Sequence, residues 1–203
     1  MAVDYPGAID MIIEDPAWVF TDALLSVPNG DLTIVDHKTA CGGQCTATSI
    51  AQGFHNDVKN HKSAHFVVGR DGSVIQVVLL KDGAGANCCL QPGHDIYWDR
   101  LLSKYRNLNV CTISIEHEDW TNDNSQTMTP EQIDASNKLN LWLVQKYSLS
   151  PNQIRSHASM RPGDRSRCPG PTFDFQALFS FLQSGGNMSG IPGGWHDECS
   201  RLF

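Results

Sequence analysis

Short segments rich in β-branched residues alternate with helical patterns along this chain, and this order constrains the fold more than any other feature. Strands are predicted over residues 32–37, 63–68, 73–80 and 110–118. The Asp-Gly step between the second and third segments is typical of a tight antiparallel hairpin. The predicted fold class is therefore α/β, with a mixed, partly antiparallel central sheet flanked by helices.

Three helices are expected around these strands. Residues 46–59 form the first, and 130–147 form the second, which follows the capping residue Thr129 and has proline at its first position. Residues 173–183 have the pattern of a final amphipathic helix. Residues 81–109 contain several glycines and few periodic apolar residues, so they predict a long loop.

The length and composition suit one main hydrophobic core, since the chain has 203 residues of which 40% are hydrophobic and 18% charged. Residues 1–30 contain turn signals without clear periodicity, so we expect an N-terminal arm packed on the domain. The domain itself is expected to span residues 31–183. Residues 184–203 have the composition of a flexible linker and tail, where a second module could start.

Charge and hydropathy argue against several classes of function. The formal net charge is -7 and there is no basic run, so a nucleic-acid partner is not expected. The first residues have neither a basic start nor an apolar segment long enough for a signal peptide or a membrane span. We expect a monomer that is made in the cytoplasm and does not insert into membranes.

Three potential metal ligands occur at separate points of the chain. His157 and Cys168 flank an arginine-rich loop, and His37 ends the first predicted strand. Imidazole nitrogen and thiolate sulfur both bind zinc, and a site with three protein ligands leaves a fourth position for water. Taken singly, each residue has an ordinary alternative as a hydrogen-bonded histidine or a buried thiol.

The strand predicted over residues 110–118 has two unlike faces. A period of two places Ile113 and Ile115 on an apolar face and Glu116 on the opposite one. Glu116 therefore points away from the aliphatic side, where its ordinary role would be that of a solvated carboxylate.

The seven cysteines are an odd number, so at least one thiol lies outside any disulfide. Cys41 and Cys45 could form a disulfide or stay reduced, and we expect small buried residues rather than a disulfide. Cys88 and Cys89 are adjacent, which suits a simple disulfide framework poorly.

Four blocks together resemble the zinc amidases related to peptidoglycan recognition proteins: residues 37–40, 63–72, 109–116 and 157–169. The resemblance covers roughly residues 32–183. It implies the mixed α/β fold of that family and hydrolysis, by zinc-activated water, of the amide between N-acetylmuramic acid and L-alanine in bacterial peptidoglycan. Many members of the family are phage endolysins.

By position, the resemblance implies that His37, His157 and Cys168 hold Zn²⁺. Glu116 takes the place of the catalytic glutamate, which would accept a proton from water and return it to the departing amine.

Three residues are also expected to bind substrate: His65, Asn87 and Thr39. A histidine at position 65 could instead be a fourth metal ligand that closes the site. The family pattern speaks against this and implies packing or a substrate hydrogen bond.

The sequence departs from the family pattern at three positions. Ala64 replaces a tyrosine that takes part in catalysis in some members, and Ser166 replaces a lysine that stabilises the oxyanion. Arg165 and Arg167 are the candidate replacements for that lysine, because a guanidinium supplies the same charge. Gly85 lies where relatives carry a pocket tryptophan, so we expect a wider or differently lined groove.

Two other functions fit parts of the pattern. A recognition module of the same fold would bind muropeptides without cleaving them, although Cys168 and Glu116 are retained. A cysteine hydrolase with a Cys/His pair would need no metal. The expected absence of a signal peptide fits both an endolysin released through a lysis pore and a muropeptide-recycling enzyme, and the linker and tail favour the endolysin.

Overall fold

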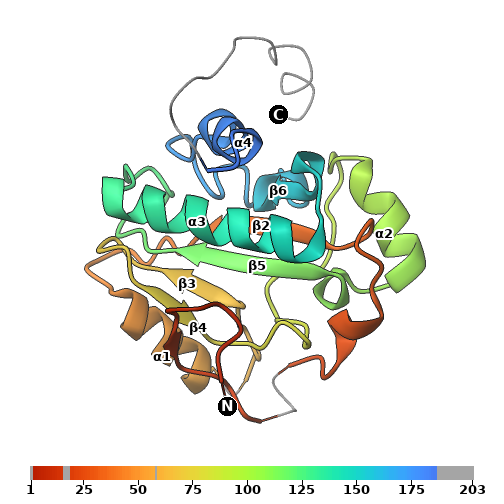
Figure 1. The fold of residues 1–203 in the computed structure, drawn as a ribbon, viewed down its shortest axis with the longest axis horizontal. Coiled ribbons are helices and arrows are strands. Elements are labelled where there is room, and N and C mark those ends of the chain that lie inside the picture. Colours follow the sequence, from red (N-terminus) through yellow and green to blue (C-terminus); the bar gives the residue numbers. More distant parts are fainter. Residues whose placement is uncertain (1, 16–18, 58, 187–203) are drawn as a thin grey trace.

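A six-stranded mixed sheet forms the centre of the molecule, with the strands in the order β1-β4-β3-β5-β2-β6 (Figure 1). The computed structural model describes residues 2–15, 19–57 and 59–186. The strands are β1 (Ile9–Asp10), β2 (Thr33–Lys38), β3 (Phe66–Val68), β4 (Val74–Gln76), β5 (Thr112–His117) and β6 (Ile154–Ser156). Only the β3–β4 hairpin is antiparallel among these neighbouring pairs. The predicted mixed α/β fold is confirmed.

Helices cover both faces of the sheet (Figure 1). They are α1 (Ala47–Asn56), α2 (Tyr97–Tyr105), α3 (Pro130–Tyr147) and α4 (Phe175–Gln183), with short 3-10 turns η2 (Ala23–Ser26), η3 (Leu108–Val110), η4 (Pro151–Gln153) and η5 (His157–Ser159). Successive side chains of a strand point to opposite faces. Phe66 and Val68 therefore join the main core with α3 and α4, whereas Val67 joins a second cluster with Ala51 of α1.

Helix α2 corrects the prediction of a continuous loop over residues 81–109. Trp98 and Leu101 are fully buried in the main core, and Tyr105 packs against it. These residues follow helical spacing. This helical spacing is present in the sequence, but the polar and turn-forming residues around it obscure it. None of the helices in the described ranges combines the length and apolarity needed to cross a bilayer.

The described part of the N-terminal segment is bonded to the sheet. Strand β1 pairs in parallel with β4. Asp4 accepts hydrogen bonds from Gln76 Nε2 at 2.6 Å and from the Leu80 amide at 2.8 Å. Most of the expected linker and tail, residues 187–203, lies outside the described residues.

Candidate metal centre

The candidate site lies at the carboxyl ends of three parallel strands. His37 is the fifth residue of β2, and the register of β2 with β5 places Glu116 directly opposite it. Strand β6 pairs with the other side of β2, and His157 follows it as the first residue of η5. Carboxyl ends of parallel strands are a frequent place for ligand sites in α/β sheets. The topology therefore brings together residues that are about 120 positions apart in the chain.

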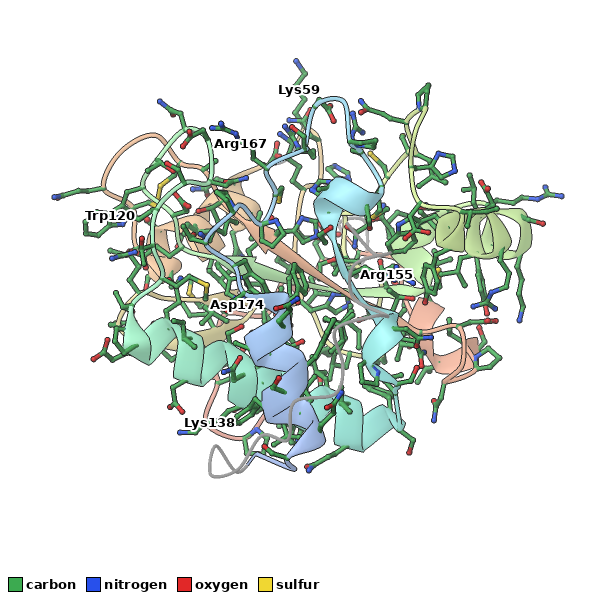
Figure 2. The ribbon with its side chains drawn as sticks, turned by 90° about the horizontal axis from the view of Figure 1, so that it is seen from above. Lys59, Trp120, Lys138, Arg155, Arg167 and Asp174 are labelled. Carbon is green, nitrogen blue, oxygen red and sulfur yellow. A yellow bond between two sulfur atoms is a disulfide. The ribbon has the colours of Figure 1, made fainter. Side chains whose placement is uncertain are left out.

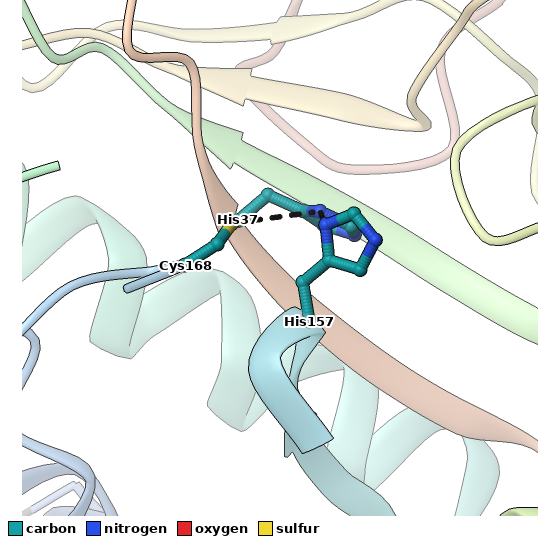
Figure 3. A group of neighbouring side chains, drawn as sticks. All are labelled: His37, His157 and Cys168. Atoms are coloured by element: carbon teal, nitrogen blue, oxygen red, sulfur yellow. Dashed lines mark hydrogen bonds between the residues drawn. The ribbon is translucent and has the colours of Figure 1, made fainter. Parts of the chain in front are cut away.

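The three predicted ligands converge on one point (Figure 3). His37 Nδ1 lies 3.0 Å from His157 Nδ1 and 4.0 Å from Cys168 Sγ. One ligand atom from each residue lies within 4.8 Å of the others. Tetrahedral zinc with ordinary bond lengths separates two nitrogens by about 3.3 Å and a nitrogen from a sulfur by about 3.6 Å. The two separations measured from His37 Nδ1 differ from these values by only a few tenths of an ångström.

Burial keeps both imidazoles in the neutral form that metal binding requires. It lowers the pKa of His37 well below the ordinary value. Burial, with help from the positive charge of Arg165, lowers the pKa of His157 to about 4. The Cys168 thiol is only 3% exposed, and burial raises its pKa to about 12. This thiol needs a nearby cation to ionise, and zinc would supply that charge.

The donor set fits a zinc ion. Two imidazoles and one thiol are borderline-soft ligands of the kind that zinc prefers. The outer nitrogens of the rings, Nε2 of His37 and of His157, are buried and have no hydrogen-bond partner within the described ranges. The Nδ1 atoms of both rings face each other and the Cys168 sulfur, so both would be available to the same metal ion.

Glu116 lies beside the three ligands. Its Oε1 is 4.0 Å from His37 Nδ1, and its side chain is 17% exposed. Burial raises the pKa of Glu116 to about 8, and the charge of Arg165 partly opposes this effect. A carboxyl group with a raised pKa beside a metal site can exchange protons near neutral pH.

The structure distinguishes the two arginines that replace the expected lysine. Arg167 donates to Asp123 Oδ2 at 2.7 Å and lies toward the outer edge of the molecule (Figure 2). The charge of Arg165, in contrast, lowers the pKa values of both His157 and Glu116. Arg165 is therefore the arginine whose field reaches the site.

His65 and Asn87 are core residues and not part of an open groove, since both are 0% exposed. His65 Nε2 donates to the carbonyl of Asp82 at 2.9 Å, and its Nδ1 accepts the Ser114 amide at 3.0 Å. Of the two roles considered for His65, the structure supports packing. Asn87 donates to hydroxyls of Thr112 and Ser114. Its assignment to direct substrate contact is corrected, because the side chain is enclosed by protein.

Thr39 and Gly85 support loops near the site. The Thr39 hydroxyl donates to the Asp119 carbonyl at 3.4 Å and accepts the Asp119 amide at 3.1 Å. At Gly85, a Cβ would collide with the backbone carbonyl of His61. Glycine is needed there for close backbone packing. The expectation of a wider or differently lined groove stays a prediction.

Cys41 and Cys45 form a disulfide, so the expectation of small buried thiols was wrong. The two residues lie in the loop between β2 and α1, where Cys41 is exposed and Cys45 is half-buried. Only four positions separate them. The turn between them brings the sulfurs together, a geometry that the residue types do not reveal.

Sequence reasoning missed the residues that hold the backbone of β2. His117 is fully buried, and its Nδ1 donates to the carbonyl of His37 at 2.7 Å, while its Nε2 lies 2.8 Å from Ser136 Oγ. Lys38 Nζ donates to the Gln126 carbonyl at 2.7 Å. The sequence did contain a signal for His117. It directly follows Glu116 in β5, so its side chain must point to the opposite face of the sheet from Glu116.

A groove of about 670 Å³ runs along residues 166–176 and reaches Ser156 and Ala158. Cys168 is the one candidate ligand that lines it.

Comparison with known proteins agrees with this fold. Solved structures with the same fold include a selenomethionine derivative of AmpD, with 20% identity, a TM-score of 0.63 and coverage of 90% of this chain and 99% of that one. N-acetylmuramoyl-L-alanine amidase LysC from Clostridium intestinale has 20% identity and a TM-score of 0.56, covering 86% of this chain and 97% of its own. AmiD from E. coli, solved with an anhydro-N-acetylmuramic acid tripeptide, has 22% identity and a TM-score of 0.55, covering 79% and 59%.

No curated protein matches the chain. A family model described as N-acetylmuramoyl-L-alanine amidase matches residues 31–171, which include all three candidate ligands and Glu116. This match spans more than half of the chain, and the fold agrees with it. The chain belongs to the N-acetylmuramoyl-L-alanine amidase family.

Proposed function

We propose that this protein hydrolyses the amide between N-acetylmuramic acid and L-alanine in peptidoglycan, with zinc held by His37, His157 and Cys168. The observation that carries the proposal is the convergence of these three ligand atoms beside Glu116 in a chain of the amidase family. When bound, zinc would polarise the scissile carbonyl and lower the pKa of water. AmiD was solved with a muropeptide, which supports peptidoglycan as the substrate class.

Glu116 is proposed as the proton carrier of the reaction. Its carboxylate would accept a proton from the attacking water and deliver it to the departing alanine amine. The raised pKa supports this role, because a group that both takes and gives a proton works best when its pKa lies near the operating pH. Its position opposite His37 in the sheet register supports it as well.

Arg165 is proposed to stabilise the oxyanion that forms on the substrate carbonyl. The positive charge of this residue acts on His157, Glu116 and Cys168, so its field is present where negative charge would develop. The Arg167 guanidinium instead donates a hydrogen bond to Asp123.

The bacterial cell wall is the proposed place of action. Endolysins from Clostridium intestinale and from a Thermus bacteriophage share the fold, which supports this proposal. Release through a lysis pore and a monomeric state stay predictions.

The reaction is tested by incubating the purified protein with bacterial cell walls and assaying new amino groups and new reducing ends separately. We expect amino groups without reducing ends. Treatment with a chelator should abolish the release of amino groups, and added zinc should restore it. Release of reducing ends instead would refute the amidase assignment.

The same assay separates the two alternatives. A recognition module would bind the walls without releasing amines. A cysteine hydrolase would keep its activity in chelator. The enclosed Cys168 thiol, whose pKa burial raises to about 12, argues against a thiolate nucleophile.

A further inference from the structure

Asn87 is enclosed on the same face of the sheet as the candidate ligand His37. Its side chain bonds to Thr112 and Ser114 of β5. These two residues share a strand face with Glu116, which lies opposite His37 in the register. Asn87 is 0% exposed, so it cannot contact a substrate in this conformation.

The hydrogen bonds determine which way the Asn87 amide points. The hydroxyl of Thr112 donates to the Leu108 carbonyl at 2.8 Å, so toward Asn87 it can only accept. Asn87 Nδ2 is therefore the atom 2.9 Å from Thr112 Oγ1, and it also lies 2.7 Å from Ser114 Oγ. The opposite atom, Oδ1, is an acceptor that has no partner at ordinary bonding distance in the described part of the chain.

His37 carries the complementary unsatisfied atom. Its Nδ1 faces the other two ligands, whereas its buried Nε2 lacks a partner at ordinary distance among the described residues. The sheet register makes the two side chains neighbours, because Asn87 bonds to Ser114, Ser114 shares a strand face with Glu116 two positions later, and Glu116 lies opposite His37. In agreement with this placement, Asn87 raises the pKa of His37 against the larger opposing effect of burial. An unused buried donor and an unused buried acceptor thus belong to neighbouring side chains, and leaving both unpaired would be costly.

We propose that Asn87 is a positioning residue whose Oδ1 accepts the Nε2–H of His37 and thereby holds the ring in the tautomer that leaves Nδ1 free for the metal. This inference rests on the proposed zinc function. Metal-binding histidines ordinarily donate their second ring N–H to an acceptor, which sets both tautomer and orientation. In the metal-free protein, His157 would then donate its Nδ1–H to His37 Nδ1 across the 3.0 Å contact.

Three variants test the proposal by zinc affinity, measured in competition with a chromophoric chelator. Asn87→Ala removes the acceptor and should weaken zinc binding about 10- to 100-fold. Asn87→Asp keeps an acceptor, and the Ser114 hydroxyl can turn to donate to it, so affinity should stay within a few-fold of wild type. Gln132→Ala is the matched control, because Gln132 is also fully buried and donates two 3.1 Å bonds to carbonyls away from the ligands. It should lose stability and keep zinc affinity.

Nitrogen-15 NMR of the histidine rings in the metal-free protein provides a second readout. We expect the wild-type His37 ring to carry its proton on Nε2, and we expect this preference to be lost in Asn87→Ala. A folded Asn87→Ala variant with wild-type zinc affinity would overturn the proposal, as would an equal loss in Gln132→Ala. If wild type bound no zinc, the proposed function would fail. The ring spectra of wild type would still decide the role of Asn87, and a proton on Nδ1 would overturn it.

Discussion

Glu116 acquires its properties from enclosure. In water its pKa would lie near 4.5, and burial raises this pKa to about 8. A carboxylate beside a cation would be stabilised, so metal binding opposes the effect of burial. With burial raising the pKa and a bound cation lowering it, the carboxyl group could both accept and release a proton near neutral pH.

Replacing Glu116 by glutamine tests its proton-carrying role. Glutamine keeps the size and polarity of the side chain but cannot take up a proton, so kcat should fall about 10²- to 10⁴-fold. Zinc content and unfolding temperature should stay at wild-type values. Full activity in a folded, zinc-loaded Glu116→Gln protein would show that another group carries the proton.

Arg165 and Arg167 form a natural pair of matched variants. Arg165→Ala should lower kcat about 100-fold, as expected when one donor to a developing oxyanion is lost. Arg167→Ala should have a much smaller effect, because that guanidinium is held by Asp123 at the surface. Steady-state kinetics on a soluble muropeptide would measure both. The reverse order of effects would transfer the oxyanion role to Arg167.

At the level of elements, the loop between β2 and α1 is closed by the Cys41–Cys45 disulfide. The loop begins two residues after the candidate ligand His37, immediately beyond the end of β2. A bridge over four positions constrains only a short stretch of the unfolded chain.

Reduction of this disulfide should lower the free energy of unfolding by about 2 kcal/mol. Denaturant titration of the zinc-free protein with and without reductant would measure the change. The Cys41→Ser/Cys45→Ser double variant is the control and should show no response to reductant. If reductant lowered the free energy of unfolding of the double variant by a similar amount, the cysteines responsible would be others than Cys41 and Cys45.

Helix α2 is tied to the start of β2 by Asp31. This buried carboxylate accepts from Lys104 Nζ at 2.6 Å, from Tyr105 Oη at 2.8 Å and from Arg100. The Lys104 hydrogen bond is the largest of the effects that lower the pKa of Asp31 from 3.8 to about 2. Ion pairs and hydrogen bonds to Asp31 therefore fix the turn before β2 against α2.

The lowered pKa of Asp31 predicts a pH-dependent stability. The contribution is fully present above about pH 4 and is lost as pH falls through about 2, since the folded state binds the proton more weakly than the unfolded state. Its size should be about 1 to 2 kcal/mol, after allowance for solvent screening by the half-exposed partners. Asp31→Asn should remove this part of the acid dependence in denaturant titrations at pH 5 and pH 2.5. An unchanged difference between the two pH values would contradict it.

For the whole molecule, zinc is expected to act as a link between distant parts of the chain. It would join β2 to the segment that follows β6. A ligand that binds only the folded state stabilises it by about 2.7 kcal/mol at a free concentration of 100 Kd.

Removal of zinc should therefore lower the unfolding temperature, and adding zinc should restore it. Calorimetry of the chelated and reloaded protein measures the shift. The His157→Ala variant should unfold at the same temperature with or without zinc, because one ligand is lost. A zinc-induced shift in that variant would mean that the ion binds elsewhere.

Local sequence patterns were sufficient to predict the structure wherever one short segment contains all the interacting groups. The cap of α3 is an example, since Thr129 accepts the amide of Gln132, only three residues later. The alternation in β5 likewise placed Ile115 in the core and Glu116 on the opposite face. Helix α2 had a local signal too, in the spacing of Trp98 and Leu101, but its polar context obscured it.

The placement of His65 and Asn87 could not be predicted in this way. Their side chains are enclosed by partners from segments more than fifteen residues away, so their burial depends on how those segments pack. Arg165 and Arg167 are chemically identical, and only the folded chain shows that Arg167 is the one paired with Asp123.

The sequence by itself determined the strand and helix pattern, the residue types of the three candidate ligands and the face on which Glu116 lies, because these follow from short-range periodicity and side-chain chemistry. The tertiary structure alone decided that His37, His157 and Cys168 meet within 4.8 Å, that Asn87 is enclosed against Thr112 and Ser114 and that Cys41 bonds to Cys45. The physical reason is that parallel strands are joined by long connections, so the contacts that build the site are set by sheet order and packing and not by neighbouring residues in the chain.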